Sequence, residues 1–359
     1  MSYPIYEVRF RPCRVWLRRT FRTALGEEVE SCVIYLALID KRGNVGYGEI
    51  APSRFIVGST TSLVLESLEL LKKVIIDEKV LGTDYYKIDK IFEKYVRYPQ
   101  DVLTGIDIAM IDLTCREFGI PLWKFLGAEK KELITDITVS LEDPEDMRDE
   151  ISDYLSRGFE ILKIKLGDPD RDLERIKILE EFNDKVKFYR IDANQGWRDL
   201  KTAIKFLKML EKLKVELVEQ PLPKNSLREL SILRNISEIP IILDESVMNI
   251  RDIVEVLIQN SCDGINIKLM KFGGIRRACT ACEIAKALNL KLMIGCMLET
   301  KVSITAAACI AARYDIDYID LDSPLLIDRV EIDVKGGVVY DGCKIILNDN
   351  PGLGVSIDL

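Results

Sequence analysis

Five short apolar segments of this chain end in charged residues that could together form a catalytic site. Counted from Lys165, these charges stand at Asp192, Glu219, Asp244 and Lys268, at intervals of 24 to 27 residues. One strand and one helix fill such an interval. Parallel barrels place their chemistry at the carboxyl ends of the strands. The order lysine, acid, acid, acid, lysine therefore predicts one site to which successive barrel strands contribute.

The three acids predict a bound divalent cation. Carboxylates that meet at one barrel mouth repel each other unless a cation holds them, and oxygen ligands without histidine or cysteine favour Mg²⁺, with Mn²⁺ as the alternative. A cation that binds a substrate carboxylate stabilises the enediolate formed when the adjacent carbon loses its proton. Taken singly, such acids are often surface charges or helix caps, as the segment Asp244-Glu245-Ser246 could be. Their joint pattern favours the metal site.

The two lysine strands predict acid–base chemistry on both faces of one carbon. Lys165 lies on the second expected strand and Lys268 on the sixth, so the two are opposed in a ring of eight. Such a pair can remove a proton from one face and return it on the other, which is racemisation or epimerisation. Lys163 shares a strand face with Lys165 and supplies the neighbouring cation that lowers the pKa of a lysine base. Taken alone, this Lys-x-Lys pair would indicate two solvent-exposed lysines at the end of a strand.

Composition excludes several functional classes. The 359 residues include no histidine, which rules out Ser-His-Asp and Cys-His catalysis and most zinc enzymes. The net charge of −8 does not suit nucleic acid, and the most apolar helical segment is too short to span a membrane. The nine cysteines have no framework spacing, and the charges throughout the N-terminal segment lead us to expect no signal peptide there. These features predict a cytoplasmic protein.

The element pattern changes once along the chain. Residues 1–50 predict antiparallel strands, and helical periodicity follows at 60–78, 86–97 and 100–118. From about residue 135, short strands alternate with helices. The eight expected strands are about 136–140, 160–166, 188–193, 216–220, 240–244, 263–268, 291–295 and 317–321. Eight parallel strands joined by crossover helices close into a barrel.

Three segments follow from this pattern. They are an N-terminal α+β capping domain (1–130), a barrel domain (131–324) and a C-terminal tail (325–359) that returns to the capping domain. The eighth strand ends in Asp320 and Asp322, which share a face and lie opposite the three metal-site acids. The alternative is that these two acids are turn residues before Pro324.

These motifs resemble those of the enolase superfamily, in its muconate-lactonizing subgroup, and most closely those of dipeptide epimerases of the L-Ala-D/L-Glu type. The matching segments are FRTAL (21–25), VGYGEIAP (45–52), LKIKLG, DANQGW, VEQP, DES, NIKLMKFGG and GLG near the C-terminus. The resemblance implies an α/β fold: a modified (β/α)7β TIM-like barrel with an α+β capping domain formed by the N-terminal segment and the C-terminal tail. It also implies an isomerase, and relatives of this kind are often homo-oligomers.

The resemblance assigns roles to the residues that match its motifs. Lys165 and Lys268 resemble the acid/base pair, and Lys163 resembles the lysine that tunes it. The motif acids that resemble Mg²⁺ ligands are Asp192, Glu219 and Asp244.

The segment DLD at the end of the eighth strand is the most specific feature of the match. Asp320 and Asp322 resemble the acids that hold the α-ammonium group of a dipeptide. With the substrate carboxylate at the metal, the dipeptide then spans the barrel mouth, and its C-terminal residue carries the Cα that is inverted.

One departure bears on the substrate. Glu-specific relatives carry an arginine just after the TAL segment, where this chain has Gly26 followed by Glu27 and Glu28. The substrate side chain is expected to meet Gly26, Phe55 and Ile56. The two acids are either solvated beside an apolar pocket, or one faces the pocket and selects Lys or Arg. We therefore expect dipeptides with apolar or cationic side chains.

Three further side chains carry open alternatives. Arg22 could swing inward and accept an acidic substrate. Glu299, after the seventh strand, either contributes to the pocket or caps the next helix. Glu49 either forms a structural salt bridge or contributes to the site.

Other functions compete with the epimerase. A muconate cycloisomerase, an o-succinylbenzoate synthase or an N-acylamino acid racemase would belong to the same subgroup. Asp320 and Asp322 argue against muconate, because they would repel the second carboxylate of this dianion. A non-catalytic binding protein is the remote alternative, and the intact lysine pair and acid triad argue against it.

Overall fold

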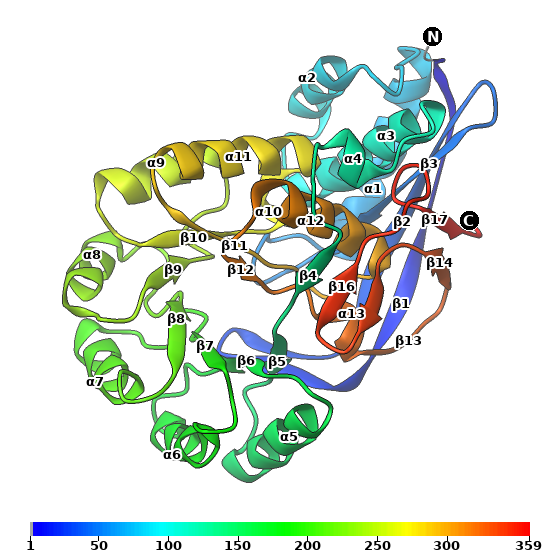
Figure 1. Ribbon diagram of the computed structural model, residues 1–359. Coiled ribbons are helices and arrows are strands. Elements are labelled where there is room, and N and C mark those ends of the chain that lie inside the picture. Colours follow the sequence, from blue (N-terminus) through cyan, green and yellow to red (C-terminus); the bar gives the residue numbers. More distant parts are fainter. Residues whose placement is uncertain (1–2) are drawn as a thin grey trace.

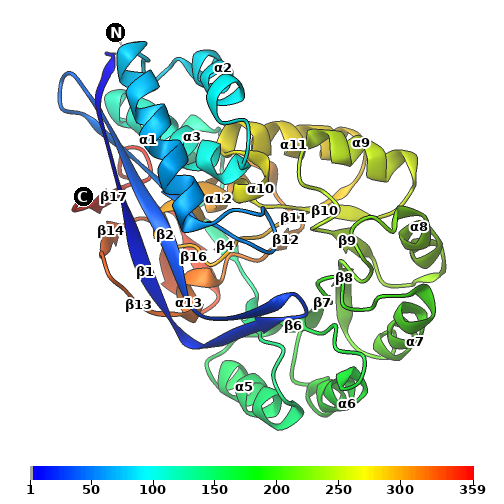
Figure 2. The same cartoon turned by 180° about the vertical axis from the view of Figure 1, so that it is seen from behind.

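The computed structural model describes residues 3–359 and consists of a curled parallel sheet and an α+β part that lies across one end of it (Figures 1 and 2). The sheet contains eight strands in the order β12-β11-β10-β9-β8-β7-β6-β5. Their bounds are β5 (Ile137–Val139), β6 (Ile161–Lys165), β7 (Phe188–Asp192), β8 (Val215–Glu219), β9 (Ile241–Leu243), β10 (Gly264–Ile267), β11 (Lys291–Ile294) and β12 (Tyr318–Ile319). A backbone hydrogen bond from Asp136 N to Ile319 O, at 3.3 Å, links the two ends of this sheet into a barrel.

Helices follow the strands and cover the outside of the barrel (Figure 1). They are α5 (Pro144–Ser156), α6 (Asp172–Phe182), α7 (Leu200–Leu210), α8 (Leu227–Ile236), α9 (Ile250–Ile258), the short α10 (Leu269–Phe272), α11 (Ile275–Ala287) and α12 (Lys301–Tyr314). Strands covered on both faces are continuous apolar runs. Ile164, Ile191 and Ile265 are accordingly fully buried. The alternation of strand and helix confirms the predicted barrel.

The N-terminal part is a sheet backed by helices. Its strands are β1 (Ile5–Thr23), β2 (Gly26–Asp40) and β3 (Val45–Ile50), and its helices are α1 (Thr61–Asp77), α2 (Tyr85–Tyr95), α3 (Gln100–Glu117) and α4 (Leu122–Phe125). The long β1–β2 hairpin reaches across the barrel mouth toward β6 and β7 (Figures 1 and 2). Its Arg22 carbonyl accepts a hydrogen bond from Leu141 N, just after β5, at 2.9 Å. The hairpin is thus fixed to the rim of the barrel.

The C-terminal segment returns to the N-terminal part. After α13 (Ser323–Leu326), β13 (Ile327–Val330) pairs antiparallel with β1 and gives the sheet order β13-β1-β2-β3. The remaining strands form two small sheets: β14 (Val334–Gly336) with β17 (Val355–Ile357), and β15 (Val339–Asp341) with β16 (Lys344–Ile346) and β4 (Glu132–Ile134). The predicted fold class, a barrel capped by both ends of the chain, is confirmed.

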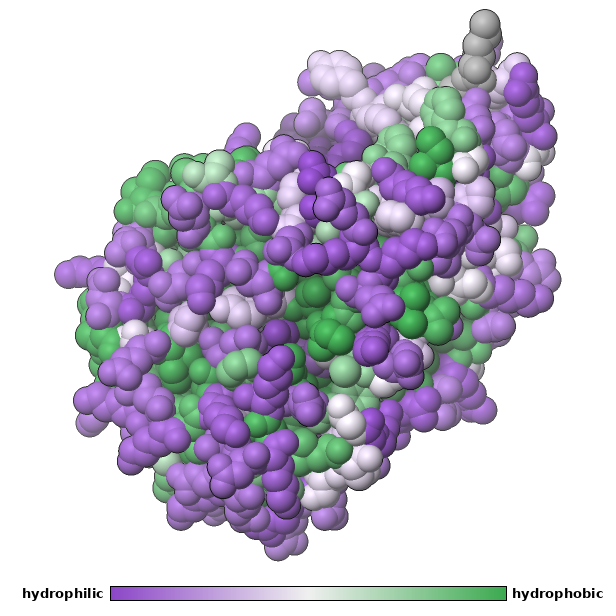
Figure 3. All heavy atoms as spheres, in the orientation of Figure 1, coloured by the Kyte–Doolittle hydropathy of each residue, from purple (hydrophilic) through white to green (hydrophobic). Residues whose placement is uncertain are grey.

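The outer surface is mostly polar. Hydrophilic side chains cover much of the face in Figure 3, and apolar patches lie at the edge formed by α8 and α9, where Ile236 and Ile258 are exposed. Within residues 3–359, no helix has both the length and the apolar character needed to cross a membrane.

Candidate active site

The carboxyl ends of β6, β7 and β8 bring three predicted site residues to the same level. Lys165 is the register partner of Asp192, and Asp192 is the register partner of Glu219. Side chains that stand opposite each other on neighbouring strands point to the same face of the sheet. The lysine and the two acids therefore meet inside the barrel mouth, as their spacing predicts.

Lys163 lies at the centre of this group. Its Nζ is 2.7 Å from Asp320 Oδ2, 2.7 Å from Glu219 Oε2 and 3.1 Å from Asp192 Oδ2. Burial opposes the charge on Lys163, but the three carboxylates outweigh it and raise its pKa well above the usual value. Lys163 thus remains a fixed cation between β6 and β12. Lys163 and Lys165 both contact Asp192 Oδ2, so their ammonium groups lie near each other.

Lys165 and Lys268 each contact one acid of the predicted triad. Lys165 Nζ is 2.7 Å from Asp192 Oδ2, and Lys268 Nζ is 2.7 Å from Asp244 Oδ2. Burial works against the charge on Lys268, but Asp244 and Glu219 outweigh it and raise its pKa. A cation bound by these acids would compete with both lysines for the same oxygens. Binding of a cation by Asp244 would therefore weaken the contact that raises the pKa of Lys268.

A fourth lysine in this network was not predicted from the sequence. Lys271 Nζ donates to Asp244 Oδ1 at 2.5 Å, to Asp244 O at 2.8 Å and to Asn266 O at 2.8 Å. It lies on α10, which begins directly after Lys268, so one helical turn returns its side chain to the same acid. The signal in the sequence was the second lysine of NIKLMKFGG. Its role here is to hold Asp244 in place.

Asn194 and Glu245 complete the network, and sequence reasoning missed both roles. Lys165 Nζ donates to Asn194 Oδ1 at 3.2 Å, and Asn194 Nδ2 donates to Glu245 Oε1 at 3.3 Å. Burial, and then the charges of Asp244 and Asp192, raise the pKa of Glu245 to about 8. Asn194 lies in the DANQGW motif and Glu245 in the DES motif, and their place in these motifs was the only indication in the sequence of a role in the site.

The residues fit a hard divalent cation at Asp192, Glu219 and Asp244. All three side chains are fully buried and offer only oxygen ligands. Glu219 Oε2 is buried without a hydrogen bond and has only the charge of Lys163 beside it. Burial alone would raise the pKa of Asp192, but Lys165 and Lys163 hold it at about 2. Asp244 is held in the ionised form in the same way by Lys268 and Lys271, whereas burial, and then the charge of Asp192, raise the pKa of Glu219. A bound cation would favour the ionised form that a ligand must have.

A tighter group of acids lies at the other side of the barrel. Among the described residues, oxygens of Asp136, Asp320 and Asp322 lie within 4.8 Å of one another. This group has its own counter-charges, because Arg190 pairs with Asp136 at 2.9 Å and Lys163 pairs with Asp320.

Asp322 is the least neutralised member of that group. Its Oδ2 accepts a hydrogen bond from Thr138 N at 2.6 Å. Burial, and then the charge of Asp320, raise the pKa of Asp322 to about 6. A cationic group that enters here would stabilise the ionised form of this acid.

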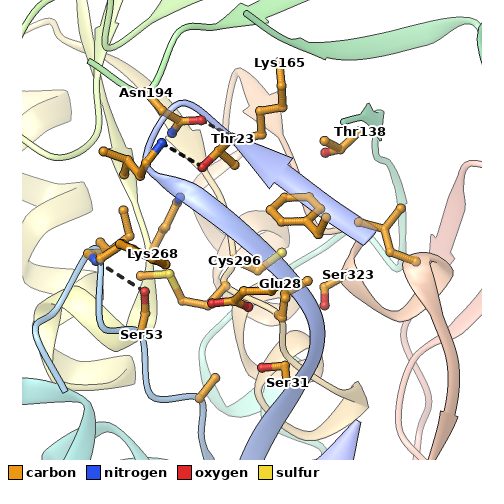
Figure 4. A pocket seen from close by; sticks show the side chains of 18 of the residues that line it. Thr23, Glu28, Ser31, Ser53, Thr138, Lys165, Asn194, Lys268, Cys296 and Ser323 are labelled. Atoms are coloured by element: carbon orange, nitrogen blue, oxygen red, sulfur yellow. Dashed lines mark hydrogen bonds between the residues drawn. The ribbon is translucent and has the colours of Figure 1, made fainter. Parts of the chain in front are cut away.

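A cavity above these strand ends is closed by the β1–β2 hairpin and the loop after β3 (Figure 4). Its empty space is about 840 Å³, part of which is open to solvent. Both predicted catalytic lysines line it, together with Asp320 and Asp322. The predicted specificity residues Gly26, Phe55 and Ile56 line its outer wall. The sequence thus identified residues on both walls of one cavity.

Register decides which hairpin residues face the cavity. A bulge between Trp16 and Phe21 sets Phe21 opposite Glu28 and Arg22 opposite Glu27. Phe21 and Glu28 line the cavity, and Lys165 Nζ lies 5.7 Å from the Phe21 ring centroid. Arg22 and Glu27 point to the other face of the hairpin.

The cavity lining includes neither the three predicted metal-site acids, which are fully buried, nor Arg22 and Glu299. Arg22 forms ion pairs with Glu27, at 3.1 Å, and with Glu142, and its side chain is 40% exposed outside the cavity. Glu299 is buried beneath the floor, where it accepts hydrogen bonds from Met297 N at 2.7 Å and Ser303 Oγ at 2.5 Å. It joins the loop before α12 to the Ser303 side chain and accepts no hydrogen bond from a backbone N–H of α12.

Glu49 also contacts the start of α12. It accepts hydrogen bonds from Thr300 N at 2.6 Å and Ser303 N at 3.0 Å. A carboxylate at a helix N-terminus satisfies free N–H groups and meets the positive end of the helix dipole. The motif VGYGEIAP thus attaches β3 to the barrel.

The chain is similar to known proteins over nearly its whole length. Residues 146–359 match the family model described as enolase C-terminal domain-like. The L-Ala-D/L-Glu epimerase of Clostridium acetobutylicum is 38% identical over 346 residues, which are 94% of this chain and 95% of that protein. The hydrophobic dipeptide epimerase of Enterococcus faecalis is 35% identical over 361 residues, 98% of this chain and 99% of that protein.

Solved structures give the same result. The substrate-liganded L-Ala-D/L-Glu epimerase from Bacillus subtilis superposes with a TM-score of 0.93 at 34% identity, covering 99% of this chain and 100% of that one. The Enterococcus faecalis dipeptide epimerase, complexed with Mg and the dipeptide L-Leu-L-Tyr, also gives 0.93 at 34% identity. That match covers 98% of this chain and 99% of the other.

Proposed function

Since the chain belongs to the enolase C-terminal domain-like family and is an isomerase, we propose that it is a Mg²⁺-dependent dipeptide epimerase that inverts the Cα of the C-terminal residue. The observation that carries this proposal is the placement of Lys165 and Lys268. Lys165 ends β6 and Lys268 directly follows β10; three strands lie between β6 and β10 on either side of the ring, and both lysines line one cavity. A substrate carbon between them is open to proton transfer on both faces.

The two lysines act as the acid/base pair in this proposal. One lysine removes the α-proton from one face, and the other returns a proton to the opposite face. Lys163 stays charged between Asp192, Glu219 and Asp320, and it adds positive potential beside Lys165. Asn194 orients Lys165, and Lys271 holds Asp244.

Asp192, Glu219 and Asp244 are the proposed ligands of Mg²⁺, and Mn²⁺ suits the same oxygen set. When bound, the metal ion supplies positive charge at the substrate carboxylate, which lowers the barrier to loss of the adjacent proton. The Mg in the Enterococcus faecalis structure supports this choice of metal.

The dipeptide lies across the mouth from the metal acids to β12. Asp320 and Asp322 are the proposed partners of its α-ammonium group, and burial of both acids makes an ammonium a favourable partner. No arginine or histidine lines the cavity among the described residues, and its outer wall is mainly apolar. We therefore propose that acidic side chains are poor substrates and that apolar or cationic ones are preferred.

A deuterium-uptake screen tests this function. A dipeptide library is incubated with enzyme and Mg²⁺ in D₂O, and mass spectrometry detects the exchanged α-proton, with chiral chromatography to show inversion. We expect exchange at the C-terminal residue only, and none with N-acetylated dipeptides. Equal turnover of acetylated and free dipeptides would point instead to an N-acylamino acid racemase.

A further inference from the structure

One acid on the outer wall of the cavity has no partner. Glu28 projects from β2 into the space bounded by Lys268, Cys296 and Ser323 (Figure 4). Within residues 3–359, its carboxylate forms no hydrogen bond and no ion pair, whereas the neighbouring Glu27 pairs with Arg22 outside the cavity. The register of the bulged hairpin sets these two acids on opposite faces.

The cations near the cavity are held by other acids. Lys163 contacts Asp192, Glu219 and Asp320, Lys165 contacts Asp192, and Lys268 contacts Asp244. None of them pairs with Glu28 in the described part of the chain. The protein therefore provides this carboxylate with no counter-charge of its own.

The apolar surroundings of Glu28 make its ionised carboxylate unfavourable without a counter-charge. The same wall carries Phe21, Leu25, Phe55 and Leu326, which offer no hydrogen-bond donors from their side chains. Burial accordingly raises the pKa of Glu28. A carboxylate that is partly removed from water gains most from a cation that arrives with the ligand.

The hairpin offers no group that would select an acidic substrate side chain. At Gly26 a Cβ atom would stand 2.6 Å from Phe55 Cζ, so a side chain there would require the ring to move. An acidic substrate side chain would meet Glu28 without a compensating cation. Like charges brought together in such a space repel strongly.

We propose that Glu28 selects dipeptides that carry a cationic side chain, of the lysine or arginine kind, for the epimerase reaction proposed above. Long, flexible cationic side chains can place their apolar stems against Phe55 and Leu326 while the charged end meets the carboxylate. The cationic residue could be the first or the second of the dipeptide, and the substrates below distinguish the two.

The test compares kcat/KM for Lys-Ala, Ala-Lys, Met-Ala, Ala-Met and Ala-Glu. Methionine matches lysine in length without the charge. We expect the wild type to prefer one lysine dipeptide over its methionine counterpart by about tenfold or more, and Ala-Glu to be the poorest. Glu28→Gln should lower kcat/KM for that lysine dipeptide by about 10- to 100-fold, mainly through KM, and leave the methionine dipeptide within about threefold.

Two further variants make the test specific. Glu27→Gln changes the adjacent acid on the outer face and should leave all five values unchanged. Glu28→Lys should reverse the preference toward Ala-Glu. Turnover of the methionine dipeptides shows that each variant is folded.

The outcomes separate this inference from the function on which it rests. Equal use of lysine and methionine dipeptides, or an equal loss on both in Glu28→Gln, overturns the cation selection and leaves the epimerase standing. Absence of epimerisation with every dipeptide overturns the function itself, and the selection with it.

Discussion

The barrel wall of the cavity pairs each of its lysines with at least one buried carboxylate, whereas the hairpin wall leaves its one acid without a charged partner among residues 3–359. Lys163 contacts three carboxylates and is 1% exposed. On the other wall Phe55 is 43% exposed, and Glu28 contacts no charged group in the described chain. A change on the barrel wall therefore disturbs a whole network, while a change on the hairpin wall affects one contact with the substrate.

This difference separates the two tasks of the cavity. The barrel wall sets the chemistry, because its groups must hold fixed positions and charges relative to one carbon. The hairpin wall sets the choice of substrate, because its side chains can vary without altering the ion pairs beneath. Substitutions on the two walls should therefore have effects of different size and kind.

The largest effect is expected from the lysines of the barrel wall. Lys268→Ala and Lys165→Ala should each lower kcat for epimerisation by about 10²- to 10⁴-fold, because each removes the acid/base group of one face. One variant should still exchange the α-proton of a single epimer in D₂O, which NMR detects. Lys177→Ala, an exposed lysine on α6, is the control. Epimerisation by either variant at the wild-type rate would contradict the two-base assignment.

Metal removal tests the same wall without a mutation. Treatment with a chelator should lower activity by at least about 100-fold, and added Mg²⁺ or Mn²⁺ should restore it. Calorimetry should detect Mg²⁺ binding to the wild type and not to Asp244→Asn. Full activity of the chelated enzyme would exclude the proposed role of the acids.

Asp322 stands at the boundary between the two walls and should show an intermediate effect. Asp322→Asn removes one partner of the substrate ammonium, a loss that typically costs about 2–5 kcal/mol. kcat/KM for dipeptides should fall accordingly, while a Mg²⁺ titration stays unchanged. Asp328→Asn, an exposed acid on β13, is the matched control. Unchanged kcat/KM in Asp322→Asn would place the ammonium elsewhere.

The smallest effect is on stability and concerns Glu150, a buried acid without a lysine partner of the kind found on the barrel wall. Glu150 on α5 accepts a hydrogen bond from Tyr154 at 3.0 Å, and burial raises its pKa to about 7 from 4.5. A carboxyl with a raised pKa favours the folded state fully below pH 4.5, and this contribution is lost as the pH rises through 7. Glu150→Gln should therefore raise Tm at pH 8 and have little effect at pH 5.

The expected gain at pH 8 is at most about 3 kcal/mol. Thermal unfolding at the two pH values measures it. Glu145→Gln, an exposed acid on the same helix, should change Tm at neither pH. A gain for Glu150→Gln that is equal at both pH values would show that the ionised form of Glu150 is not the cause.

The barrel was predictable because its signals are local. Each apolar strand is followed by its charge, and the interval between charges fixes one strand and one helix, so the motif residues fell at strand ends as expected. The resemblance to the enolase superfamily, read from the same motifs, is confirmed. The second layer of the network was missed, because Lys271 and Asn194 contact the site through turns whose geometry no spacing specifies.

The hairpin was less predictable because side-chain direction depends on register. A single bulge in a strand moves the residues beyond it to the other face. The bulge between Trp16 and Phe21 decides that Glu28 and not Arg22 faces the cavity. Nothing in the local sequence specifies that bulge. The sequence alone therefore leaves open whether Arg22, Glu27 or Glu28 faces the cavity.

The pairing of β13 with β1 joins the last part of the chain to the first. About three hundred residues separate the two strands, and the whole barrel lies between them. Most barrel strands pair with their neighbours in sequence, but this sheet is complete only when residues 327–330 have been added. Leu326, which lines the cavity, directly precedes β13. A nascent or C-terminally truncated chain can thus contain every acid and lysine of the barrel mouth and still lack an enclosed substrate cavity.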